Sequence, residues 1–114
     1  MSRHLNIQIE TTDRRLDIEM LGTNQVSPGT QISLADGSTV TWSSAPLKKY
    51  AGEPYVFNLA VGLVSAVGAG VVSRWLYDKL KQRPATKLRI NHTEVEIEQN
   101  KIRIVIEQIE KDGE

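Results

Sequence analysis

The sequence of 114 residues contains no cysteine. Disulfide bonds, thiolate catalysis and cysteine-ligated metal sites are therefore excluded. The sequence also lacks an excess of either charge, because 14 Lys and Arg residues balance 14 Asp and Glu residues. Nucleic-acid binders usually carry a basic surplus, so we expect no nucleic-acid partner.

Histidine is scarce as well. The two histidines, His4 and His92, have no second metal ligand at a usual spacing, and we expect both to be solvated. Gly68-Ala69-Gly70 lacks the third glycine and the preceding strand of a dinucleotide-binding fingerprint. We therefore expect no catalytic residue, no cofactor and no metal site, and the chain is not predicted to be an enzyme.

Three glutamates, Glu94, Glu96 and Glu98, alternate near the C-terminal end of the chain. A carboxylate cluster can bind a cation. Because Lys87 and Arg89 are expected opposite them, a salt-bridged solvent face is the favoured interpretation.

The first ten residues, MSRHLNIQIE, lack the apolar core of a signal peptide, and this predicts a cytoplasmic location. A chain of this length has room for one domain with a modest core.

The main positive feature is a run of twenty uncharged residues between Glu53 and Arg74. As a helix, at about 1.5 Å per residue, the run would be roughly 30 Å long. That length suits a helix buried in a small domain, and it also suits a bilayer's hydrocarbon core. Pro54 and Pro84 lie near the two ends of a predicted helix that reaches about Gln82, and Arg83 is expected to be extended.

The first residues alternate between apolar and polar, at 5, 7 and 9 and again at 16, 18 and 20. Period two predicts two strands, joined at Thr12-Asp13, with Ile9 facing Leu16. The alternative is a short helix from Arg14 to Leu21 that ends at Gly22, since Thr-Asp is not a preferred hairpin turn.

Two further hairpins have clearer turns. Ile32 is expected to face Val40 across a loop that ends at Gly37, which takes the left-handed position. In the other, a turn at Asn91-His92 places Ile90, Arg89, Leu88 and Lys87 opposite residues 93 to 96 in that order.

The C-terminal segment repeats apolar residues at helical spacing, at Ile102, Val105, Ile106 and Ile109, with Asn100 as a candidate N-cap. Its β-branched residues also alternate, at 102, 104 and 106, which leaves a strand as the alternative.

These segments predict an α+β fold in which antiparallel hairpins pack against one long Gly/Ala-rich helix, followed by a short C-terminal helix. We expect a single domain over residues 1–114, with hairpins in 1–46, the long helix in 54–83, and a hairpin plus helix in 86–110. The predicted hairpins need an apolar cover, which favours a buried helix or a protomer interface.

Membrane insertion of the same helix is the alternative. Its apolar residues contribute about −3 to −5 kcal/mol on an insertion scale, which is marginal against Asn58, Ser65 and Ser73. Aromatic residues flank the run, and Arg74 with the basic residues after it would then remain on the cytoplasmic side of an inner membrane. A single-pass protein that oligomerises through its glycine-rich helix, and disrupts a membrane, is the corresponding alternative function.

Small side chains follow one side of the predicted helix and would let another backbone approach closely. Near its end, Trp75 and Tyr77 lie beside Arg74 and could anchor a partner, or Trp75 could close the end of the core. We predict a surface for a protein partner or for self-association, with a dimer expected. Its residues are Gly62, Ala66, Ala69, Gly70, Ser73, Arg74, Trp75 and Tyr77.

The pattern of residues 57 to 110 resembles a group of small accessory proteins of bacterial conflict systems, the effector-associated constant components. The shared pattern is a Gly/Ala-rich helix (62–70) ending at Trp75-Leu76, a basic stretch (79–83), a hairpin (88–97) and a closing helix. The resemblance implies a non-enzymatic partner of an effector or sensor in a bacterial defence complex. It transfers no functional residue to this chain.

Overall fold

The computed structural model describes residues 3–13, 15–23, 25–44, 55–65, 67–83 and 85–112. In these ranges the chain forms a six-stranded antiparallel sheet, with strand order β2-β3-β4-β1-β5-β6, and three helices. The elements in chain order are β1 (Arg3–Thr11), α1 (Leu16–Leu21), β2 (Gln31–Ser33), β3 (Thr39–Ser44), β4 (Tyr55–Leu63), α2 (Gly68–Gln82), β5 (Lys87–Ile90), β6 (Thr93–Val95) and α3 (Gln99–Asp112). The expected α+β class is confirmed.

The two longest strands, β1 and β4, lie side by side in the middle of the sheet. They pair along their whole length, from Arg3 opposite Leu63 to Thr11 opposite Tyr55. In both strands the large apolar residues occupy odd positions, so the period of two sends them to one face. The buried apolar residues of this pair are Leu5, Ile7, Ile9, Phe57, Leu59, Val61 and Leu63.

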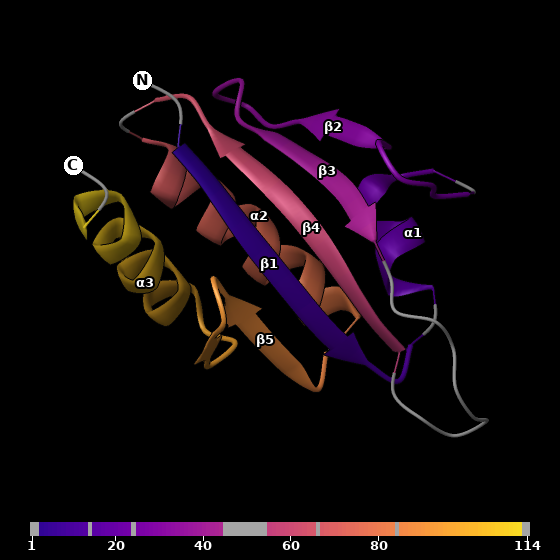
Figure 1. The fold of residues 1–114 in the computed structure, drawn as a ribbon. Helices are drawn as coiled ribbons and strands as arrows, with labels where there is room; N and C mark the ends of the chain where they lie inside the picture. The colour runs from indigo at the N-terminus through magenta and orange to yellow at the C-terminus, as the bar shows by residue number, and fades with distance from the viewer. Residues whose placement is uncertain are drawn as a thin grey trace.

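All three helices lie on this apolar face. Figure 1 shows α2 crossing behind β1 and β4, with α1 behind β3 and α3 beside α2. Each helix adds buried side chains to one core, including Leu16 from α1, Leu76 from α2 and Ile106 from α3. The opposite face of the sheet carries no helix among the described residues.

The expected hairpin near the N-terminus is wrong, and its alternative is confirmed. Residues 16 to 21 form the helix α1, which ends at Gly22 in the left-handed conformation with φ 66°. Its buried side chains, Leu16, Asp17, Met20 and Leu21, recur at helical spacing. β1 therefore pairs with β4 and β5, both far along the chain, and not with its neighbour in sequence.

The expected long helix over residues 54–83 is also wrong. Residues 55 to 63 are the strand β4, and the helix α2 begins at Gly68. Its end is as expected, at Gln82, with Arg83 extended at φ −135° and ψ 91°. Pro54 and Pro84 lie outside the described residues.

The long helix that the membrane alternative requires is therefore not formed. Of the helices in the described ranges, none combines the length and the apolar content that a bilayer crossing requires. The large apolar side chains of β4, Phe57, Leu59, Val61 and Leu63, are buried in the core of the protein.

The other two hairpins are confirmed. Ile32 pairs with Val40, and Gly37 has φ 92°. Arg89 pairs with Glu94, and the turn residues Asn91 and His92 have φ values of 48° and 72°. The strand β6 ends at Val95, so the expected pair between Lys87 and Glu96 lies beyond the paired residues.

The C-terminal helix is confirmed over its strand alternative. Ile102 and Ile106 are buried, whereas Ile104, between them in sequence, is 59% exposed. The helix begins at Gln99, so Asn100 lies inside its first turn and is not the N-cap.

A buried carboxylate joins α1 to the sheet. Asp17 is 1% exposed, and its Oδ2 accepts hydrogen bonds from Trp42 Nε1 at 3.0 Å and the Tyr55 hydroxyl at 2.6 Å. Its Oδ1 accepts from the backbone N–H of Ile18 at 2.9 Å. Both carboxylate oxygens therefore have partners, which offsets the cost of burying the group.

Replacing Asp17 by Ala should destabilise the protein by about 2–4 kcal/mol, because it leaves the Trp42 and Tyr55 donors without their acceptor. Asp78→Ala is the matched control, since Asp78 is an exposed residue of α2. Urea unfolding followed by circular dichroism measures both. Equal unfolding free energies for the two variants would show that the Asp17 contacts contribute nothing.

Candidate functional site

The residues predicted as an association surface are divided between two faces of the molecule. Gly62 lies on β4 and belongs to the face of the sheet without helices, whereas the others that the structure describes lie on α2. Ala66 lies outside the described residues. The structure therefore does not bring the predicted set together into one patch.

On α2 the small residues contact the protein's own core. Ala69 is 4% exposed and Ser73 is fully buried, with its Oγ donating to the carbonyl of Gly70. Arg74 is exposed, while Gly70 and the two aromatic residues are half-buried. Trp75 and Tyr77 both pack against the core, and the Lys81 ammonium lies 6.0 Å from the Tyr77 ring.

A carboxylate in the turn between β2 and β3 holds the start of α2. Asp36 Oδ2 accepts from the hydroxyls of Ser65 at 2.7 Å and Ser38 at 2.9 Å, and its Oδ1 accepts from the Ser38 N–H. Desolvation would raise the pKa of Asp36, but the hydrogen bonds from Ser65 and Ser38 together outweigh it and hold the pKa below its ordinary value of 3.8.

The start of α2 fits against this turn because residue 68 is glycine. A Cβ at Gly68 would lie 3.0 Å from Leu63 Cδ2 and 3.4 Å from Ser38 Oγ. A Cβ at Gly70, two residues later, would meet no atom within 4 Å. The backbone of α2 at Gly68 therefore lies close to Leu63 of β4 and to Ser38 of the β2–β3 turn.

The candidate interaction surface is the face of the sheet opposite the helices, which we call the open face. It is seen from the front in Figure 1. Its side chains come from the even positions of β1 and β4 and from the partners of those positions in β2 and β3. All of them are exposed or half-buried: His4, Asn6, Gln8, Glu10, Gln31, Ser33, Thr39, Thr41, Val56, Asn58, Ala60 and Gly62.

Among these side chains, Glu10 at the end of β1 is the one that is Asp, Glu, Lys or Arg. Ala60 and Gly62 make the second half of β4 low on the open face. Asn6 and Thr41 stand on either side of Ala60, and His4 and Thr39 stand on either side of Gly62. The hydroxyl and amide groups among them can each donate and accept a hydrogen bond.

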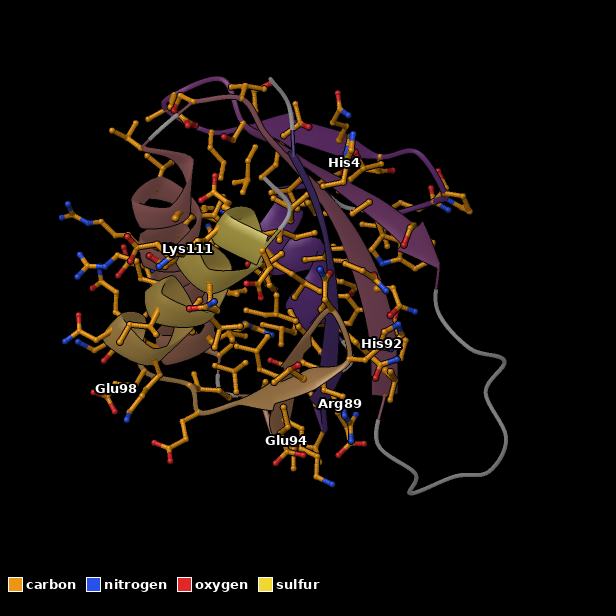
Figure 2. The ribbon with its side chains drawn as sticks, turned by 60° about the vertical axis from the view of Figure 1, so that its left-hand side comes forward. His4, Arg89, His92, Glu94, Glu98 and Lys111 are labelled. Carbon is orange, nitrogen blue, oxygen red and sulfur yellow. The ribbon has the colours of Figure 1, made fainter. Side chains whose placement is uncertain are left out.

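Charged residues appear at one end of the open face, where β1 meets β5. Glu10 pairs with Lys87, and Arg89 lies 3.9 Å from Glu94 and donates to Gln8 Oε1 at 3.1 Å. Figure 2 shows Arg89 and Glu94 close together, and His4 and His92 on the side away from the helices. The charges at this end balance each other.

Sequence reasoning missed the open face because β4 was taken for a helix. A signal for the strand was present: Asn58, Ala60 and Gly62 alternate with large apolar residues. Alternation of small and polar with bulky residues indicates a half-buried strand.

The described part of the chain contains no group of three His, Asp or Glu side chains placed to hold a metal ion. Glu94, Glu96 and Glu98 are all exposed, and Glu96 and Glu98 follow the end of β6. His4 and His92 are exposed as well.

No protein-family model, curated protein or solved structure matches this chain.

Two glycine substitutions in α2 should have opposite effects. Gly70→Ala should stabilise the protein by about 0.5–1 kcal/mol, because alanine is the better helix former and the site is open. Gly68→Ala should instead lower stability, because the new methyl group would press on the buried Leu63. Thermal melts of the two variants test this, and a gain in both would show that α2 does not approach the turn as closely as described.

The hydrogen bonds to Asp36 should make stability depend on pH. Because its folded pKa is lower than its ordinary value of 3.8, the stabilisation is fully present above that value and is lost as the pH falls through the folded pKa. The stability difference between the wild type and Asp36→Asn should therefore shrink on acidification. Unfolding free energies measured along a series of acidic pH values test this, and a constant difference would contradict it.

Proposed function

We propose that this protein is a non-enzymatic interaction module, and that its open face binds another protein chain. The absence of charged residues from the part of the open face on β2, β3, β4 and residues 4–8 of β1 carries the proposal. On an ordinary solvated surface about 25–35% of residues are charged, and 25% of this whole chain is charged. The face instead concentrates uncharged hydroxyl and amide groups around Ala60 and Gly62.

Depletion of charged residues at the centre is the compositional mark of protein–protein interfaces. The centre of the open face fits this mark, and the charged pairs at the β1–β5 end correspond to a polar rim. The face is also rigid, since its side chains stand on the paired strands β3, β4 and β1. A rigid surface lowers the entropy lost on binding.

A role as an accessory component of a bacterial effector or defence complex is the biological setting we propose. Its support is the resemblance over residues 57 to 110. The Trp75-Leu76 dipeptide, the basic stretch after it, the β5–β6 hairpin and the closing helix α3 follow in the expected order. The glycine-rich helix of that pattern is shorter here than expected, because it begins at Gly68 and not at Gly62.

Lysine substitutions on the open face should abolish partner binding. Thr41→Lys and Ala60→Lys each place a charge at the centre of the face, whereas Gln82→Lys places the same charge at an exposed position of α2. The three variants and the wild type are immobilised, exposed to the same cell lysate, and compared for the proteins that they retain.

A protein retained by the wild type and by Gln82→Lys, and lost from both face variants, is the expected result. If every retained protein binds all four forms equally, the open face is not the binding surface. Circular dichroism of each variant checks that the loss is not due to unfolding.

A further inference from the structure

We infer that the occupant of the open face is a second copy of this chain, so that two sheets stack face to face in a two-fold symmetric dimer. The inference rests on the proposed function, because it names the protein that the face binds. It is argued from the chemistry of the face, from its size and from the small residues at its centre.

The first argument is self-complementarity. In a two-fold dimer, each residue near the axis meets its own copy. A lysine or glutamate there would meet a like charge, whereas an amide or hydroxyl can donate to its copy and accept from it. The central positions of the open face, including Asn6, Thr39 and Thr41, are of this second kind.

The charges support the same occupant. The chain has no net charge, so two copies do not repel each other as wholes. At the β1–β5 end, Lys87 and Arg89 are balanced by Glu10 and Glu94. A different protein with a strong net charge would find no surplus of opposite charge on this face.

The second argument is size. At about 3.3 Å per residue, the nine-residue strands β1 and β4 are about 30 Å long. The strands β3, β4, β1 and β5 have 6, 9, 9 and 4 residues. With about 4.8 Å between neighbours, they cover roughly 450 Å² of flat area before side-chain relief is added. A standard interface buries about 800 Å² of accessible surface on each partner, so the flat area is a little over half of that value and side-chain relief adds to it.

The third argument is the low centre. Packed sheets lie about 10 Å apart, which requires small or interlocking side chains between them. Ala60 is exposed on β4, and Gly62 has no side chain; a Cβ there would lie 3.0 Å from Thr39 Oγ1. The smallest side chains of the open face, at Ala60 and Gly62, therefore lie on β4, where a facing sheet could approach closely.

The test measures the mass of the full chain by light scattering after gel filtration, over a dilution series. The wild type should have twice the mass of one chain and dissociate on dilution. Ala60→Lys and Thr41→Lys should each weaken the dimer by at least about tenfold, because like charges would meet across the interface. Ile104→Lys, on the exposed side of α3, should leave the dimer unchanged.

A charge exchange makes the test specific to two-fold packing. Ala60→Lys and Ala60→Glu should each form a weaker dimer alone, and an equal mixture of the two should recover the wild-type dimer, because opposite charges then meet. Failure of the mixture, with a dimeric wild type, would overturn the placement of residue 60 against its own copy.

A wild-type chain that stays monomeric at every concentration would overturn the inference, and so would a dimer that survives both face variants. Neither result decides the proposed function. A monomer whose open face retains a different protein in the binding experiment would keep the proposed function and exclude the dimer.

Discussion

The whole structure depends on one constraint, the alternation of side chains along the paired strands β1 and β4. Because the odd positions from Leu5 to Ile9 and from Phe57 to Leu63 are large and apolar, one face of the sheet must be covered, and the three helices cover it. Because the even positions other than Val56 are small or polar, the other face has no need of a cover within the chain. The division between core and open face follows from this single register, since a slip of one residue would exchange the two.

Short hydrogen-bonded links then set how the helices sit on the apolar face. Asp17 ties α1 to β3 and β4, Asp36 ties the β2–β3 turn to the start of α2, and Asp13 pairs with Arg83 at the end of α2 at 2.8 Å. In each case a carboxylate on one element accepts from donors far away in the sequence. Apolar packing alone is non-directional, so these polar contacts specify the orientation that packing leaves open.

The open face and the helical side differ in what they offer a partner. On α2, the small residues that were predicted to form an association surface pack inside the molecule, with Ala69 and Ser73 buried against the protein's own core. The open face is built on several paired strands, and its hydroxyl and amide groups favour a partner surface that also carries hydroxyl and amide groups. That contrast is why the proposed interface lies on the sheet and not on the glycine-rich helix.

The sequence by itself determined the elements whose signals are local. The β5–β6 register followed from apolar and charged pairing around Asn91-His92, the β2–β3 turn followed from Gly37, and the end of α2 followed from the proline after Arg83. Only the tertiary structure decided between strand and helix for Leu16 to Leu21, whose apolar spacing fits either period. The alternation in Tyr55 to Leu63 indicates a strand, but the uncharged run that continues into α2 also fits one long helix. The choice depends on β1 pairing with β4, whose residues lie about half the chain away. The open face was hidden for the same reason: its side chains come from four strands that meet only after this long-range pairing, and no local pattern contains them.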